Sequence, residues 1–266
     1  MQFQWLGGPT FLVEWDGFRV LADPIFGEGP AAFVLNRHPS TGAAQAPIAR
    51  LAPLPPARLD GLDLLLVSHL HRDHFDAPAA ERLDKQVRVA VPRPDAGAVR
   101  RWGFTSVWGL TWWQYFTLTK DGARLRVTAL PARHAADEAV NADMGLVNGY
   151  LIEYRTDQER YSIYWTGDTV WFDGLTVIRE QAGRPDLLVP HMGAVGVDGP
   201  RGRLTLDATE ATHLIDLFQP ATVIPVHHHT FAHYVEPIDR LESALQATPY
   251  AGRLVVLREG ESWATQ

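Results

Sequence analysis

The chain has 266 residues, of which 46% are hydrophobic and none is cysteine, and its formal net charge at pH 7 is −7. This length and apolar content suffice for one large α/β domain or two small ones. The missing cysteines exclude disulfides, thiolate catalysis and cysteine-ligated zinc, so any metal ion must be held by nitrogen and oxygen. Lys and Arg form no basic run, which argues against nucleic acid as the main partner and favours a small-molecule substrate.

The first residues, from Met1 to Trp5, lack the basic and apolar regions of a secretion signal. No apolar run approaches the ~20 residues that span a bilayer. We therefore expect a cytoplasmic protein without a membrane span.

Strand-like and helix-like segments alternate along most of the chain. Short apolar runs between turn residues predict strands at 11–15, 18–22, 62–67, 87–91, 125–130, 150–154, 161–165, 187–189, 222–226 and 254–257. Apolar residues at helical spacing predict helices at 79–83, 95–102, 175–181, 207–218 and 237–245, the fourth opening on an Asp207-x-x-Glu210 pair typical of a capping box. The segment 27–60, rich in Gly, Ala and Pro, predicts a long surface loop that is either a functional lid or a plain structural excursion.

So many strands do not fit one simple open sheet. The strands cluster early and late, and the helices are spread through both halves of the chain. This order predicts an α/β fold built as a four-layer αββα sandwich, in which two facing mixed β-sheets are flanked by helices. No repeat or low-complexity linker divides the chain, so we expect a single domain over residues 1–266.

Three imidazoles and a carboxylate crowd into six residues directly after the apolar run 62–67, as His69, His71, Asp73 and His74. The loop that leaves the carboxyl end of a buried strand is a common place for ligands in α/β proteins. Neutral imidazole suits zinc, and a hard carboxylate also accepts manganese or iron. This spacing is improbable by chance in a chain with 11 histidines, so it predicts a metal site that can serve two adjacent ions.

Four further polar side chains stand directly after predicted strands. Asp23 follows 18–22, His134 follows 125–130, Asp168 follows 161–165 and His227 follows 222–226. Each alone could be a turn or cap residue, because Asp beside Gly or Pro is common in turns. Their joint placement after strands indicates that they belong to the same site.

The pattern His-x-His-x-Asp-His from His69 to His74 resembles the hallmark of the metallo-β-lactamase superfamily of metallohydrolases, and the likeness extends over nearly the whole chain. Segments 5–7, 22–24, 68–74, 167–169 and 224–227 further resemble the branch that contains ascorbate-phosphate lactonases and phospholipase D-like enzymes acting on N-acylphosphatidylethanolamine. The resemblance implies the metallo-β-lactamase fold, which is the sandwich predicted above.

The resemblance also implies two sets of metal ligands that share one carboxylate. The first set is His69, His71 and His134, the second is Asp73, His74 and His227, and the shared bridge is Asp168. Asp73 and Asp168 are then the catalytic carboxylates. Asp23 would orient a ligand or a bound water from outside these sets, with a plain Asp-Pro turn as the alternative. The implied cofactors are two divalent ions, Zn²⁺ first, with Mn²⁺, Fe²⁺ and Ni²⁺ as alternatives.

The last ligand stands in a run of three histidines. The positions of Pro225 and Phe231 relative to the family pattern favour His227. Alternate side chains of an extended segment point to opposite sides, so His228 would point away and His229 would face the same cavity as His227. There His229 would contact a ligand or the substrate.

Four other histidines are open to a pocket or a packing role. His191 follows the predicted strand 187–189, which makes it a candidate pocket residue. His213 lies within a predicted helix, and His38 and His233 lie in loops, so a surface or packing role is the default for these three.

Two ions about 3.5–4 Å apart acidify a bridging water, and the hydroxide attacks an electrophile without a protein nucleophile. The chain has no cysteine and no Gly-x-Ser-x-Gly elbow, in keeping with this chemistry. His71 stands where oxygen-reducing di-iron relatives carry a carboxylate, which favours hydrolysis over redox chemistry. We expect a lactonase-like hydrolase of a small ester or lactone. The alternatives are a phosphodiester or phospholipid hydrolase and a metal-binding protein with a non-hydrolytic role.

Aromatic side chains crowd between residues 102 and 116, namely Trp102, Trp108, Trp112, Trp113, Tyr115 and Phe116. They could line an apolar pocket beside the metal site. Core packing and the interface of a homo-oligomer explain them equally well.

Overall fold

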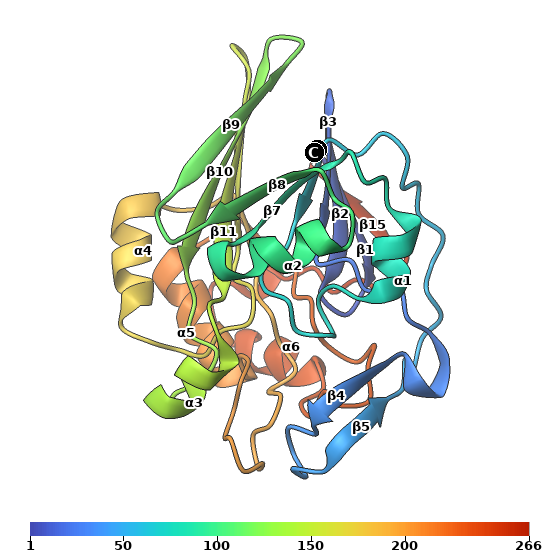
Figure 1. Cartoon of the computed structure of the whole chain (residues 1–266). Helices are drawn as coiled ribbons and strands as arrows, with labels where there is room; N and C mark the ends of the chain where they lie inside the picture. The colour runs from blue at the N-terminus through green and yellow to red at the C-terminus, as the bar shows by residue number, and fades with distance from the viewer. Residues whose placement is uncertain (266) are drawn as a thin grey trace.

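Two β-sheets face each other in the computed structural model, which describes residues 1–265 (Figure 1). In spatial order, the first sheet consists of β15 (Ser262–Ala264), β1 (Gln2–Gly7), β2 (Thr10–Trp15), β3 (Phe18–Ala22), β6 (Leu64–Leu66), β7 (Arg88–Pro92) and β8 (Ser106–Leu110). The second consists of β14 (Thr222–Val223), β13 (Leu187–Val189), β12 (Arg160–Trp165), β11 (Asn148–Arg155), β10 (Ala123–Pro131) and β9 (Tyr115–Lys120). Both sheets are mixed, since β3, β6, β7 and β8 pair in parallel, as do β12, β13 and β14, whereas the other pairs are antiparallel.

Strand alternation builds the core between the two sheets. In β2, Phe11 and Val13 point into this central core, whereas Leu12 between them belongs to the apolar cluster on the outer face. In β10, Leu125 and Val127 join the central core from the opposite sheet. Each such fully buried side chain contributes roughly 1.5–3 kcal/mol through the hydrophobic effect, so this inner layer fixes how the sheets face each other.

Helices cover the outer faces of both sheets. Their bounds are α1 Ala77–Arg82, α2 Ala96–Arg101, α4 Gly174–Ala182, α5 Ala208–Phe218 and α6 Asp239–Leu245. A further helix, α3 (Glu138–Met144), packs against Ala135, Val195 and Leu204 instead. Apolar residues of α1 and α2 pack on the first sheet, and those of α4, α5 and α6 pack on the second. The predicted αββα sandwich is therefore confirmed. Within residues 1–265, no helix has both the length and the apolar character needed to cross a membrane.

Most predicted elements have counterparts in the structure. The helix predicted at 207–218 is α5, and the Asp207 carboxylate accepts a hydrogen bond from the Glu210 amide at 2.8 Å, as expected of a helix cap. The strand predicted at 254–257 is wrong, because Leu254 makes a single bridge to Val223 before the chain turns toward β15. Sequence patterns did not predict β1, β8, β9, β15 and α3.

The prediction that the segment 27–60 is one long surface loop is wrong, because the segment contains a separate hairpin. Its strands are β4 (Phe33–Arg37) and β5 (Ala44–Ile48), which pair in antiparallel register. Phe33 and Ile48 bury their side chains against Ile25 and Phe231, and this small apolar cluster attaches the hairpin to the sandwich. The hairpin lies beside the strand ends that carry the predicted ligands (Figure 1).

Candidate metal centre

The predicted ligands gather at one end of the sandwich because the strands that precede them end on the same side. The segment 69–74 follows β6, His134 follows β10, Asp168 follows β12 and His227 follows the short β14. The strands β10 and β12 run in the same direction, since both are antiparallel to β11. The fold thus brings together side chains as far apart in the sequence as His69 and His227.

Three histidines form the first donor set. The Nδ1 atom of His71 lies 2.9 Å from Nε2 of His69 and 3.1 Å from Nε2 of His134. The outer nitrogen of His134 donates a hydrogen bond to the Leu204 carbonyl at 2.9 Å, which leaves its Nε2 lone pair facing the other two rings. Burial lowers the pKa of all three, that of His71 to about 4, so the rings are neutral near pH 7. Three nitrogen lone pairs that converge in this way suit a divalent cation.

Two carboxylates and two histidines form the second donor set. Nε2 of His74 lies 3.2 Å from Asp168 Oδ2 and 3.9 Å from Asp73 Oδ2. Nε2 of His227 lies 3.7 Å from Asp168 Oδ1 and 3.8 Å from Asp73 Oδ2. Asp168 Oδ2 is also 3.5 Å from Nε2 of His134, so Asp168 touches both sets as the predicted bridge requires.

The hydrogen bonds of the second set leave one nitrogen atom of each ring available for a metal ion. His227 donates its Nδ1 hydrogen to the Met192 carbonyl, and His74 donates its Nδ1 hydrogen to Asp23. The Nε2 atoms of both rings are buried and have no hydrogen-bond partner within residues 1–265. Burial alone would lower the pKa of His74, but Asp168, Asp23 and Asp73 outweigh it and raise the pKa well above its usual value. Such a concentration of buried negative charge around unpartnered nitrogen atoms suits a divalent cation.

Asp23 is buried and contacts Ser68 and His74 of the motif segment. One carboxylate oxygen accepts from the Ser68 amide at 2.7 Å, and the other accepts from the Ser68 hydroxyl and from His74 Nδ1, each at 2.6 Å. Because the Ser68 hydroxyl donates to Asp23, it accepts from His69 Nδ1 at 2.9 Å. One buried carboxylate thereby fixes the ring orientation of a histidine in each donor set.

His191 lies in the site but is not free to bind an ion. Its Nε2 accepts the indole hydrogen of Trp165 at 2.6 Å, and since an indole can only donate, the His191 hydrogen sits on Nδ1. That Nδ1 donates to Asp168 Oδ1 at 2.8 Å. Burial lowers the pKa of His191 to about 3, in keeping with a neutral ring. His191 therefore orients the shared carboxylate.

His233 lies in the site, although its place in a loop predicted a surface or packing role. It is buried, and its Nε2 lies 3.2 Å from Asp73 Oδ2, close to His227. Its Nδ1 is buried without a hydrogen-bond partner in the described chain. No strand precedes it, so the rule of polar residues after strands could not have found it. Its position two residues after Phe231 was the available signal, because Phe231 and His233 both pack against Phe33 of the hairpin.

The expectation that His229 faces the cavity is wrong. Its side chain is 42% exposed, lies 3.3 Å from Glu259 and does not line the cavity. The alternation rule fails because the run is not extended: His227 and His229 have φ values of +61° and +36°, in the left-handed region. His228 is buried against the Trp5 ring, with centroids 4.5 Å apart, and points away from both donor sets.

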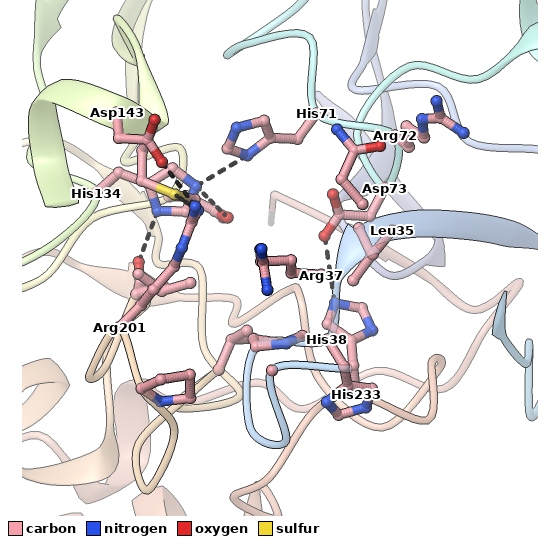
Figure 2. Close-up of a pocket in the computed structure, with 18 of the residues that line it drawn as sticks. Leu35, Arg37, His38, His71, Arg72, Asp73, His134, Asp143, Arg201 and His233 are labelled. Atoms are coloured by element: carbon pink, nitrogen blue, oxygen red, sulfur yellow. Dashed lines mark hydrogen bonds and ion pairs between the residues drawn. The ribbon is translucent and has the colours of Figure 1, made fainter. Parts of the chain in front are cut away.

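A cavity of about 630 Å³ opens onto the two donor sets (Figure 2). Its walls come from β4, from the start of the motif loop, from α3 and from the segment 195–204. Figure 2 shows His71 and His134 on one side and Asp73 and His233 on the other. None of the aromatic residues between 102 and 116 lines this cavity. Trp108 and Phe116 pack on the central core instead, whereas Trp112, Trp113 and Tyr115 are exposed.

We expect the purified protein to hold close to two metal ions per chain when it is expressed with zinc or manganese. The reason is that three histidine nitrogen atoms converge in the first donor set, two buried nitrogen atoms of the second set have no hydrogen-bond partner within residues 1–265, and both sets meet at Asp168. Elemental analysis measures the ratio, and chelation should lower both the metal content and the melting temperature, because an ion that binds only the folded state stabilises it. A folded protein with almost no metal after metal-replete expression would contradict the assignment.

Comparisons with known proteins agree with this geometry. The family model described as "Beta-lactamase superfamily domain" matches residues 18–228. The chain is 26% identical over 262 residues to an N-acyl-phosphatidylethanolamine-hydrolyzing phospholipase D of Caenorhabditis elegans, covering 91% of this chain and 69% of that protein. It is 25% identical over 264 residues to a metal-dependent hydrolase of Methanosarcina barkeri, covering 98% and 97%. A crystal structure of a possible metal-dependent hydrolase from Veillonella parvula shares the fold, with a TM-score of 0.80 at 18% identity over 99% of this chain and 98% of that one.

Proposed function

The chain belongs to the β-lactamase superfamily, and we propose that this metal-dependent hydrolase holds two divalent ions, zinc first, and cleaves a small ester or lactone. The observation that carries the proposal is the position of Asp168. It lies within 3.7 Å of donor nitrogen atoms in both sets, and both sets face one cavity. Two adjacent ions that share a carboxylate are a common arrangement for hydrolysis.

When bound, such ions supply an activated water and polarise the scissile carbonyl. The protein contributes orientation and the exclusion of bulk water. Asp23 and His191 hold His74 and Asp168 through hydrogen bonds, so the donor atoms are fixed before substrate arrives. Leu70, Val195 and Leu204 supply an apolar part of the cavity wall.

The cavity supports a small substrate attacked by water. Its volume of about 630 Å³ falls in the usual range for small-molecule sites. Among the described residues that line it, there is no Ser, Thr, Cys, Lys or Tyr. The lining therefore offers no hydroxyl, thiol or amine nucleophile, which favours direct attack by water over a covalent enzyme intermediate.

Phosphodiester or phospholipid hydrolysis is the second candidate. It is favoured by the similarity to the Caenorhabditis elegans protein, whose name describes a phospholipase D, over 91% of this chain. An activated water can attack phosphorus as well as a carbonyl carbon. The two candidates differ in the shape and charge of the scissile group, and a substrate panel separates them.

The panel consists of γ-lactones, 4-nitrophenyl esters and bis(4-nitrophenyl) phosphate, each assayed with Zn²⁺ and with Mn²⁺. We expect turnover of lactones or esters that is lost on chelation and restored by the metal alone. Faster turnover of the phosphodiester would favour the second candidate. If neither metal supports turnover of any member by a protein that holds two ions, the hydrolase proposal fails for these substrate classes.

A further inference from the structure

Strand β4 contributes Leu35, Asn36 and Arg37 to the cavity wall. Residues two apart in a strand share a face, so Phe33, Leu35 and Arg37 point the same way. Phe33 fixes this face by packing edge-on against Phe231 and His233, with ring centroids 5.1 and 5.6 Å apart. Leu35 and Arg37 follow it along the cavity wall. The strand therefore places an arginine in the cavity that the donor sets share.

The hairpin that carries Arg37 is held at its tip. Nδ1 of His38 accepts hydrogen bonds from the Ser40 and Thr41 amides at 3.2 and 3.3 Å, which closes the turn. The tip also packs closely on the segment 195–204: a Cβ on Gly199 would overlap the Pro39 carbonyl. The Arg37 backbone is thus held at both ends of the hairpin, and from there its solvent-exposed side chain lines the cavity.

The charges that line the cavity leave Arg37 without a counterion. Asp73 and Asp168 are committed to the donor sets, and Asp143 forms an ion pair with Arg201 at 2.6 Å. Within residues 1–265, neither Arg37 nor Arg72 has a carboxylate within 4.0 Å. Figure 2 shows Arg37 between the His134 side and the Asp73 side of the cavity, with Arg72 at its rim. The described lining holds three arginines and three aspartates, and of these charged side chains only Arg37 and Arg72 are outside both the donor sets and an ion pair.

We propose that Arg37 binds an anionic group of the substrate, a carboxylate or a phosphate, that is separate from the scissile bond. The proposal rests on the hydrolase function proposed above and specifies its substrate class. A guanidinium suits this task because its planar donors match a carboxylate or phosphate in a two-point contact. Leu35 lies beside Arg37 on the same wall and contacts the apolar part of such a substrate. Arg72 adds positive charge at the rim and attracts the anion on its way in.

The test uses two 4-nitrophenyl esters that differ in one terminal group. In 4-nitrophenyl hexanoate the acyl chain ends in a methyl group, and in mono-(4-nitrophenyl) adipate it ends in a carboxylate. We expect the metal-loaded protein to prefer the adipate ester. Arg37→Ala should lower this preference about tenfold, the amount that corresponds to ~1.4 kcal/mol, mainly through KM. Arg37→Lys should restore part of it, because it keeps the charge without the two-point contact.

The control is Arg88→Ala, which removes an exposed arginine from β7, outside the cavity, and should leave the ratio of the two esters unchanged. An equal effect of Arg37→Ala on both esters would overturn the proposal. If the wild type cleaves neither ester, the hydrolase proposal fails for esters, and calorimetry with monomethyl adipate decides the anion site by itself. Weaker binding to Arg37→Ala than to wild type and Arg88→Ala supports the site, and equal binding to all three overturns it.

Discussion

Replacing Asp168 by alanine is expected to abolish turnover and to remove at least one of two metal ions per chain. Asp168 is the carboxylate that touches both donor sets, at 3.2 Å from His74 and 3.5 Å from His134. Replacing groups that only orient metal ligands commonly costs about 10–100-fold in affinity or activity. The loss of a carboxylate shared by two ions should therefore cost at least about 100-fold in kcat/KM.

The measurement pairs elemental analysis with steady-state kinetics on the best substrate of the panel. Asp168→Asn keeps the shape of the side chain but removes its charge, so it separates packing from ligand chemistry. The control is His213→Ala on the exposed side of α5, where the ring touches the edge of Trp171 and no donor set. Equal losses in Asp168→Asn and His213→Ala would mean that general destabilisation, and not the shared carboxylate, governs activity.

The parts of the site that follow buried strands could be predicted from the sequence. A run of apolar residues at 62–67 is a local signal, and the ligands from His69 to His74 come directly after it. The same rule placed His134, Asp168 and His227 at the ends of strands, and the structure brings all of them to one end of the sandwich. Polar residues after strands come together because strands that run in the same direction end at the same edge of a sheet, where the following loops meet.

The rest of the site depends on contacts that no local pattern carries. His233 meets Asp73 across 160 positions of sequence, through a loop whose path is set by Phe231 packing on Phe33. The hairpin β4–β5 was missed because its strands are largely exposed, with little alternation of polar and apolar residues. Its position follows from the few side chains that anchor it, among them Ile48.

The run of three histidines gives the second large expected effect. We expect His227→Ala to remove one ion per chain and to lower kcat/KM at least about 100-fold. A direct ligand should cost at least as much as a residue that only orients a ligand, whose replacement costs about 10–100-fold. The reason is that the Nε2 atom of His227 is buried, unpartnered and within 3.8 Å of both carboxylates of the second donor set. Elemental analysis and kinetics on the same preparation measure both effects.

The neighbours of His227 serve as matched controls, because each is also an imidazole in the same turn. His229→Ala should keep both ions and change stability by less than about 0.5 kcal/mol, since its ring is partly exposed and pairs with Glu259 away from the cavity. His228→Ala should keep both ions and lose the ring contact with Trp5, worth about 0.5–1.5 kcal/mol in addition to its buried area. The three rings point in different directions because the backbone at His227 and His229 is left-handed. Loss of an ion in His229→Ala, with full metal content in His227→Ala, would place the last ligand two residues later and show that the turn has another path.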